Sequence, residues 1–353
     1  MAFVQKTENG TWCVRFRVNG KQMQKTFKDK ASAAKFRKIA ETASHEAVAC
    51  TVKMKVSEIF SHYRELVTAH KRGARSESLR IGRLMRAPFA QLDSRSISRK
   101  DMQAYCDSRI KSKHPTTGKP IGAGTVLREF KTISSVFNWA IERGYMVENP
   151  IKGVHLPKSP EHRERVASDE DIQKLLVASG WDGETPPANS TQLVIAAFLF
   201  SCRTGMRSGE IRQIEPAWIE GNVIHLPANA TKTLSRRDVA LGAEARKILA
   251  LVKEANGDSL FSMSAEIRDT LFRKVRDRAG LGPVLDSRGN EIKEGLHFHD
   301  GRATFATWAA SPDPKTGVPR LDVMALARQT GHKDLKMLMR YYRASAEEVA
   351  KRL

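Results

Sequence analysis

The chain has 353 residues with 60 Lys and Arg against 39 Asp and Glu, a formal net charge of +21. This length allows two or three domains, and so large a surplus favours a polyanionic partner such as nucleic acid over a merely soluble basic surface. The surplus is uneven, with +6 on residues 1–50, +10 on residues 51–150 and +5 on residues 151–353. We therefore expect the first 150 residues to do most of the binding.

The four cysteines (Cys13, Cys50, Cys106 and Cys202) are far apart and form no CxxC pair. This argues against a zinc site or a disulfide framework and fits a reducing compartment. No apolar run approaches the roughly 18–20 residues of a transmembrane helix, and the N-terminus lacks the apolar core of a signal peptide. We therefore expect a soluble intracellular protein.

Residues 1–50 are predicted to form a small sheet followed by a helix. Residues 11–18 alternate between apolar and polar side chains, Asn19-Gly20 is a hairpin signal, and residues 21–27 return as a second strand. Asp29 can cap a helix over about 30–48. Arg15 and Arg17 share one face of the first strand, which either enters a DNA groove or is simply solvated.

Residues 51–155 are predicted to be all-helical, with helices over about 56–70, 76–85, 98–110 and 123–143 and a turn-rich loop at 111–120. Near the start of this region lies a basic run: Lys71, Arg72, Arg75, Arg80, Arg83 and Arg86. Each alone is more often solvated than a specific contact, but together they favour phosphate binding that depends steeply on salt. Residues 156–165 are polar, contain two prolines and are the predicted linker.

From residue 166 helices are predicted over about 168–178, 191–204, 207–214, 243–255, 264–280, 299–310, 321–329, 334–342 and 345–352. Two short strands, 223–226 and 238–241, flank Lys232. The predicted fold class is mainly α with small β-sheets (α+β). Its predicted parts are a sheet-plus-helix module (1–50), a helical domain (51–155), a linker (156–165) and a mostly helical domain with a short β-hairpin sheet (166–353).

Two arginines are predicted to lie on apolar helix faces. Arg207, Glu210 and Ile211 fall on one stripe, and Glu210 either satisfies Arg207 or orients it toward a phosphate. At the start of another predicted helix, His299 lies one turn before Arg302, where an anion is favoured. Two inward arginines from separate segments suit a bidentate clamp on one phosphate.

Two adjacent tyrosines close the helix predicted over 334–342. Leu335, Leu338 and Tyr342 share its apolar face, which assigns Tyr342 to the core and leaves Tyr341 free to face a cleft. Either tyrosine alone could be an ordinary aromatic anchor, as His332 alone could be an ordinary core histidine.

Taken together, these segments resemble the tyrosine recombinase family, and in particular the phage-type integrases. Residues 204–211 (T-G-M-R-S-G-E-I) match the first arginine box with Arg207 and the acidic position Glu210. The other family positions are matched by Lys232 in the hairpin, His299 and Arg302 in H-x-x-R, His332 in T-G-H, and Tyr341 as the nucleophile. The resemblance covers about 165–353, and more weakly the N-terminal module as an arm-type DNA-binding module and the helical domain as a core-binding domain.

The resemblance implies that Arg207, Lys232, His299, Arg302, His332 and Tyr341 are catalytic, with Glu210 supporting them. Tyr341 would attack a scissile phosphate and form a 3′-phosphotyrosyl link, and Lys232 would protonate the leaving 5′-oxygen. The covalent link conserves the energy of the phosphodiester, so neither a metal nor another cofactor is expected. The implied partners are double-stranded DNA attachment sites, three further copies of the chain in a homotetramer, a host DNA-bending protein and an excisionase, but no membrane. The implied location is the cytoplasm of a bacterial host, at the nucleoid.

The expected function is integration and excision of a phage or other mobile element. Alternatives are a DNA invertase or resolvase of the same family, a type IB topoisomerase and a non-catalytic DNA-binding regulator. The basic N-terminal module favours integration, and the complete catalytic set argues against the regulator. The chain departs from the family at Gly301, where a Leu is usual, which predicts a looser helix start. Residues 311–320 resemble an insertion, and helix 345–353 is expected to dock on its own or a neighbouring protomer.

Overall fold

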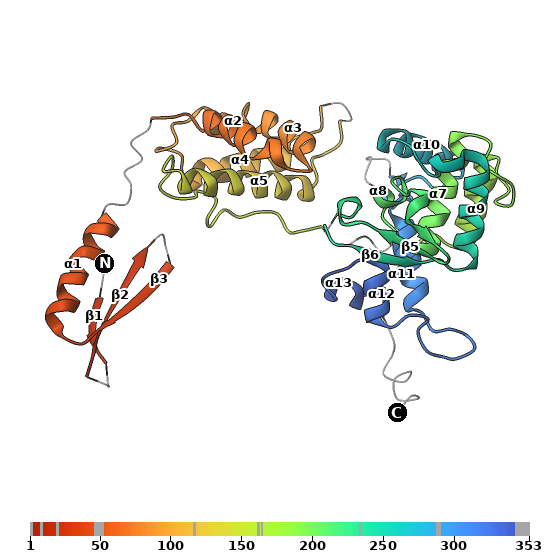
Figure 1. The fold of residues 1–353 in the computed structure, drawn as a ribbon. Coiled ribbons are helices and arrows are strands. Elements are labelled where there is room, and N and C mark those ends of the chain that lie inside the picture. Colours follow the sequence, from red (N-terminus) through yellow and green to blue (C-terminus); the bar gives the residue numbers. More distant parts are fainter. Residues whose placement is uncertain are drawn as a thin grey trace. The chain divides into compact units, whose positions relative to one another are not determined.

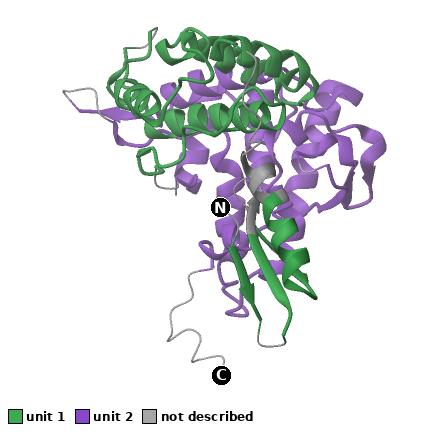
Figure 2. Cartoon of the chain, turned by 90° about the vertical axis from the view of Figure 1, so that its left-hand side faces the viewer, with its two compact units in different colours: residues 1–162 green, residues 163–353 purple. Residues whose placement is uncertain are grey.

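The computed structural model describes residues 3–7, 10–18, 21–45, 53–115, 118–160, 163, 165–232, 234–286 and 291–342. The chain divides into two compact units, residues 1–162 and 163–353 (Figure 2). Within the described ranges, no helix is long and apolar enough to cross a membrane.

The first unit begins with a three-stranded antiparallel sheet in the order β1-β2-β3 (Figure 1). Its strands are β1 (Phe3–Lys6), β2 (Trp12–Val18) and β3 (Lys21–Phe27), and α1 (Lys30–His45) follows. Val14 and Ala33 form the buried contact between sheet and helix, and Asp29 accepts a hydrogen bond from Ser32 N (2.8 Å) at the helix start. β1 was not predicted because four residues give too short a pattern. The predicted turn at 19–20 and the helix end at 46–48 lie outside the described residues.

The rest of the first unit is a helical bundle of α2 (Val56–Leu66), α3 (Ala74–Leu84), α4 (Arg99–Lys111) and α5 (Ala123–Glu142), with 3-10 turns at Thr68–His70 and Pro88–Gln91 (Figure 1). α5 forms the centre of its core, since Val126, Phe130, Ile133 and Phe137 are all buried there. These are the positions that the helical spacing predicts to face inward. The bundle therefore rests on apolar packing along one long helix.

The second unit contains eight described helices and two small sheets. The helices are α6 (Asp169–Ser179), α7 (Ser190–Thr204), α8 (Ser208–Ile211), α9 (Ala243–Asn256), α10 (Ala265–Arg278), α11 (Asp300–Ala310), α12 (Val323–Thr330) and α13 (Lys336–Met339). One antiparallel sheet has the order β4-β5-β6 (Ile219–Glu220, Val223–Leu226 and Arg237–Ala240), and β7 (Val284–Leu285) pairs with β8 (Glu291–Lys293). Short 3-10 turns lie at Pro216–Trp218, Ala228–Ala230 and Gly257–Ser259.

α7 is the central helix of this unit, and it contacts α6, α8, α9, α10 and α11. Its run from Leu193 to Cys202 is buried, which is why the segment is apolar on all sides. The observed architecture, largely helical with small sheets, confirms the predicted fold class.

Two predicted helices are shorter in the structure. Arg207 has extended backbone angles and precedes α8, which ends at Ile211, so the predicted helix over 207–214 is too long. Glu210 and Ile211 nevertheless face inward, as expected. α13 ends at Met339, so Tyr341 and Tyr342 lie in the turn that follows instead of in a helix over 334–342. The C-terminal helix expected over 345–353 lies outside the described residues.

Candidate active site

Arg207 and Arg302 are braced against each other's chain segments. Arg302 on α11 is 5% exposed and donates to the carbonyl of Gly205, two residues before Arg207, over 2.6 Å. In return, Arg207 donates to the carbonyl of Gly331, next to His332, over 3.2 Å. The structure therefore brings together three segments of the predicted site that are far apart in sequence.

Two glycines in left-handed backbone conformations make this bracing possible. Gly205 ends α7 at φ +68°, and a Cβ there would lie 2.6 Å from Phe305 Cδ1 and 2.9 Å from Thr330 Cγ2. Gly331 ends α12 at φ +69°. Because other residues rarely adopt this conformation, both positions let a helix end abruptly with its last carbonyls turned toward an arginine.

Gly301 serves a different purpose from the one expected of it. A Cβ on Gly301 would lie 3.1 Å from Phe198 Cε2, 3.2 Å from Cys202 Sγ and 3.2 Å from the Phe198 carbonyl. Gly301 is buried at the start of α11, where that helix packs on α7. The expectation of a looser helix start is therefore wrong, because the missing side chain allows a closer approach of the two helices.

Gly301→Leu is expected to lower the free energy of unfolding by about 1–3 kcal/mol, because the added carbons overpack the contact between α11 and α7. Gly209→Ala on α8 is the matched control, since nothing lies within 4 Å of a Cβ there, and it should be neutral or stabilising. Urea unfolding of both variants checks this, and equal stability of Gly301→Leu and wild type would contradict it.

His332 is held in one tautomer by Thr330. The Thr330 hydroxyl donates its single proton to the Leu326 carbonyl over 2.6 Å, so its oxygen is left to accept from His332 Nδ1 at 2.7 Å. The lone pair of neutral His332 is therefore on Nε2. Arg302 Nη2 lies 3.3 Å from Nδ1 and 3.2 Å from Nε2, beside the ring instead of in line with one nitrogen.

The pKa values in the site reflect burial and crowded positive charge. Burial, together with the charges of Arg302 and Arg207, lowers the pKa of His332 to about 3. Burial, followed by the charges of Arg207 and Arg237, lowers the pKa of Arg302 to about 9, so it stays protonated at neutral pH. A cluster whose crowded positive charges lower the pKa values of its own members is suited to bind an anion.

This shift predicts a pH dependence of stability. The pKa of His332 is about 3 in the folded chain and about 6.5 when unfolded, so the unfolded state binds more protons between these values. Stability is therefore full above about pH 6.5 and falls as the pH is lowered. His332 should account for less than about 1.4 kcal/mol between pH 7.5 and 5.5, because the ring is partly exposed.

Urea unfolding of wild type and His332→Gln at both pH values measures this contribution. The variant should lose less stability on acidification than wild type. An identical loss in both proteins would show that His332 does not carry the effect.

Lys232 and His299 lie at the exposed side of the site. Lys232 is exposed in the loop between β5 and β6, which are the two strands predicted to flank it. His299, which also keeps an exposed surface, precedes α11. Desolvation and then the charge of Arg302 lower the pKa of His299, and the charge of Lys232 acts in the same direction, so Lys232 is within electrostatic range of the cluster.

The two tyrosines differ in their hydrogen bonding. Tyr342 donates to the Leu321 carbonyl over 2.8 Å, and burial raises its pKa to about 12. The Tyr341 hydroxyl has no hydrogen-bond partner among the residues that the structure describes, while its ring packs on the small cluster around Phe305 and Leu338. Tyr341 also acts electrostatically on Arg302, so Tyr341 lies within electrostatic range of the arginine cluster.

Sequence reasoning also missed two arginines that support this cluster. Arg163 binds the buried carboxylate of Asp300 through Nε at 2.9 Å and Nη2 at 2.7 Å, and so fixes the start of α11. Arg237 on β6 binds Glu210 at 2.5 Å. No local pattern in the sequence pairs either arginine with its distant partner. Within the described part of the chain, no group of three His, Cys, Asp or Glu could hold a metal ion.

The predicted DNA-binding residues of the first unit have different environments. Arg15 is exposed on β2, whereas the side chain of Arg17 is not among those that the structure describes. Lys71 is engaged with Tyr63 at 2.8 Å and Glu77 at 2.9 Å. Arg72 and Arg75 are exposed. Only Arg80 and Arg83 of the predicted set line the pocket described next.

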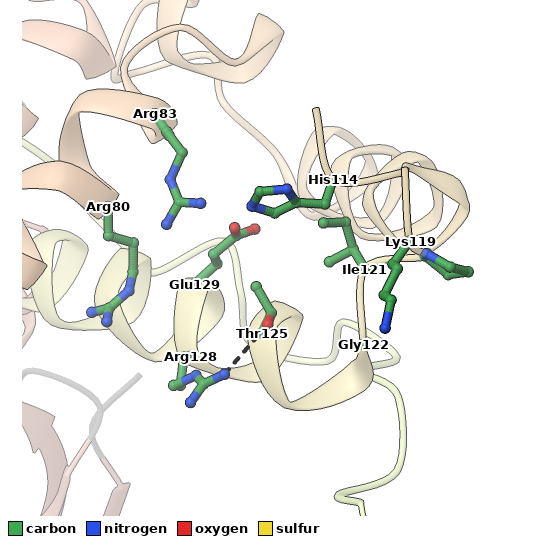
Figure 3. A pocket seen from close by; sticks show the side chains of 10 residues that line it. Arg80, Arg83, His114, Lys119, Ile121, Gly122, Thr125, Arg128 and Glu129 are labelled. Carbon is green, nitrogen blue, oxygen red and sulfur yellow. Dashed lines mark hydrogen bonds between the residues drawn. The ribbon is translucent and has the colours of Figure 1, made fainter. Parts of the chain in front are cut away.

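This basic pocket, of about 410 Å³, lies at the start of α5 (Figure 3). It is lined by Arg80, Arg83, His114, Lys119, Pro120, Ile121, Gly122, Thr125, Arg128 and Glu129. Among its described lining residues the one acidic side chain, Glu129, is already bound by Arg109 from α4 at 2.8 and 2.9 Å. The pocket therefore presents an uncompensated excess of positive charge.

The profile of the phage integrase family matches residues 169–348. A putative integrase/recombinase of Haemophilus influenzae is 33% identical over 298 residues, covering 82% of this chain and 72% of that protein. A shufflon-specific DNA recombinase of Escherichia coli is 30% identical over 304 residues, covering 85% and 72%. A lambda integrase dimer bound to a COC′ core site has the same fold, with a TM-score of 0.63 at 18% identity over 96% of this chain and 94% of that one. The chain belongs to the phage integrase family of tyrosine recombinases.

Proposed function

We propose that the chain is a site-specific recombinase that cuts and rejoins DNA through a 3′-phosphotyrosyl intermediate, and that it integrates and excises a mobile element. The observation that carries this proposal is the set of contacts that brings Arg207, Arg302 and His332 together, within electrostatic range of Tyr341. Family membership supplies the reaction class, and this arrangement supplies the groups that the reaction needs.

The arginines supply binding and transition-state stabilisation. Arg207 and Arg302 are fixed by carbonyl contacts, so their remaining N–H groups are preorganised for the non-bridging oxygens of a scissile phosphate. The Tyr341 oxygen attacks phosphorus, the bond to the 5′-oxygen breaks, and the DNA 3′ end becomes linked to the tyrosine. Attack by the 5′-hydroxyl of a partner strand reverses the step and releases Tyr341.

Two groups are suited to move protons. Neutral His332, with its lone pair on Nε2, can accept the Tyr341 proton. A bound phosphate offsets the arginine charges that depress the pKa of His332 and so raises that pKa toward its useful range. Exposed Lys232 reaches the leaving 5′-oxygen from its loop and donates a proton to it, and His299 hydrogen-bonds the phosphate.

The proposed partner is double-stranded DNA carrying attachment sites. Strand exchange between two duplexes cuts four strands, and one tyrosine serves each cut, so the active assembly is a homotetramer. We assign residues 1–50 to arm-type sites, 51–155 to the core site, 156–165 to the linker and 166–353 to catalysis. A host DNA-bending protein and an excisionase complete the proposed assembly, which would work at the nucleoid of a bacterial cell.

A second candidate is a recombinase that inverts or resolves DNA, which the similarity to a shufflon-specific DNA recombinase favours. Removal of residues 1–50 distinguishes the two candidates. An integrase of the proposed kind loses binding to distant arm sites and keeps binding to short core sites, whereas binding unchanged at every site favours the second candidate.

The central test uses nicked suicide duplexes whose core sequence is selected from a randomised pool by binding to the protein. The wild-type chain should form an adduct that resists SDS, with the DNA attached through its 3′ end. Absence of any adduct on duplexes that the protein binds would overturn the proposed chemistry.

The basic pocket at the start of α5 fits a backbone phosphate of the same DNA, since phosphate contacts position a protein on a duplex. Arg83→Ala is expected to weaken duplex binding and to reduce the slope of log K against log salt by about 0.9. Arg95→Ala, an exposed arginine paired with Asp93 at 2.8 Å, is the control. Equal slopes for Arg83→Ala and wild type would exclude the contact.

A further inference from the structure

Arg237 is a buried arginine within the cluster that the mechanism above does not use. It opens β6, and its side chain is 8% exposed. Nη2 binds Glu210 Oε2 at 2.5 Å, Nη1 donates to the Gln329 carbonyl, and Nε is buried with no partner among the described residues. A Cβ on Gly331 would lie 2.9 Å from its Cδ and Nε, so Arg237 packs against the glycine that precedes His332.

Glu210 is shared between two arginines. Its Oε1 binds Arg207 Nη1 at 3.0 Å, and its Oε2 accepts from Arg207 N at 2.8 Å and binds Arg237 at 2.5 Å. The carboxylate is 2% exposed. Glu210 is thus well placed to orient Arg207, because it holds both its backbone and its guanidinium.

A buried carboxylate in this position has an electrostatic cost for the reaction. Paired with Arg207 alone, Glu210 would cancel the positive charge that Arg207 offers to a phosphate, because charges interact strongly in a site with little water. A second guanidinium on the other oxygen removes this cancellation. Two arginines around one carboxylate leave a net positive charge beside Arg302.

The geometry also separates the roles of the two arginines. Arg207 has a 22% exposed side chain and an N–H group directed to the Gly331 carbonyl, at the open side of the site. Arg237 is enclosed by Glu210, the Gln329 carbonyl and the Gly331 backbone. Arg237 therefore acts on the phosphate only through its neighbours.

We propose that Arg237 is a positioning residue that neutralises Glu210, so that Glu210 can orient Arg207 without cancelling its charge toward the scissile phosphate. This inference rests on the proposed function for its substrate. It predicts that the effect of removing Arg237 depends on whether the Glu210 charge is present.

The experiment compares Arg237→Gln, the double variant Glu210→Gln/Arg237→Gln, and Arg276→Gln as a control. Arg276 is another buried arginine of this unit, with a 10% exposed side chain paired with Asp277, and it lies outside the site. Single-turnover adduct formation on the suicide duplex should fall about 100-fold in Arg237→Gln. The double variant should form the adduct at least about tenfold faster than Arg237→Gln, and Arg276→Gln should react at the wild-type rate.

The salt dependence of duplex binding adds a readout that a direct phosphate contact would change. Its slope should be the same in Arg237→Gln and wild type, whereas a lost phosphate contact reduces it by about 0.9. A double variant no faster than Arg237→Gln, or a reduced slope, would overturn the inference. Thermal unfolding shows whether each variant is folded.

The inference and the proposed function can fail separately. If wild type forms the adduct and Arg237→Gln forms it equally fast, the inference is overturned and the proposed function stands. If wild type forms no adduct, the proposed chemistry fails, and inorganic phosphate then tests Arg237 without DNA. The NMR signals of the His332 ring report phosphate binding. The affinity for phosphate should fall in Arg237→Gln and recover in the double variant. An affinity in Arg237→Gln equal to that of wild type would overturn the inference.

Discussion

Tyr341→Phe is expected to abolish the covalent adduct with DNA completely, while Tyr342→Phe should form it at close to the wild-type rate. Phenylalanine has no oxygen to attack phosphorus, so no residual pathway to a phosphotyrosyl link remains. The choice between the neighbours follows from their bonding, since Tyr342 donates its proton to the Leu321 carbonyl over 2.8 Å. Burial also raises the pKa of Tyr342 to about 12, which makes its phenolate harder to form.

Denaturing gels of suicide-duplex reactions, followed by peptide mapping of the attached DNA, measure this result. Tyr342→Phe loses one hydrogen bond and should be less stable by about 1 kcal/mol, so it should be compared at a temperature where both variants are folded. An adduct with Tyr341→Phe, or DNA mapped to Tyr342, would show that the unbonded hydroxyl is not the nucleophile.

Arg302→Ala should slow adduct formation by about 10²–10³-fold, the usual effect of removing one preorganised donor from a site of developing charge. The substitution also removes the donor to the Gly205 carbonyl at 2.6 Å and the cation beside His332. Arg302→Lys should remain impaired, because a single ammonium cannot reproduce two N–H directions held by a planar guanidinium.

Single-turnover rates at saturating enzyme measure this effect separately from binding. Arg320→Ala is a suitable control in the same unit, since Arg320 contacts the loop around Ser311 and the ring of Trp308. A rate for Arg302→Ala within a few-fold of wild type would mean that the phosphate is held elsewhere.

Much of the fold could be predicted because its signals are local. α7 is apolar throughout since it is buried on all sides, and Val126, Phe130, Ile133 and Phe137 of α5 follow helical spacing. The strands around Lys232 are found where predicted. The short helix ends were not predictable, because Arg207 and Tyr341 are placed by contacts with distant segments and not by their own sequence pattern.

The candidate site could be predicted only in part, for the same physical reason. Its residues were recognised from motifs, but their supports were not. Arg237 meets Glu210 across 27 positions of the sequence, and Arg163 meets Asp300 across 137. Gly301 was misjudged because helix propensity describes an isolated helix, whereas the space between α11 and α7 decides which side chain fits there.

The reciprocal contacts between the arginines and the glycines also have a consequence during synthesis of the chain. Arg207 leaves the peptidyl-transfer centre 124 residues before its acceptor Gly331, which at ribosomal speeds corresponds to about 6–25 s. Throughout that interval Arg207 has neither this acceptor nor the neighbouring histidine. On the proposed function, the growing polypeptide would therefore be able to bind DNA through its basic first half before it could break a strand.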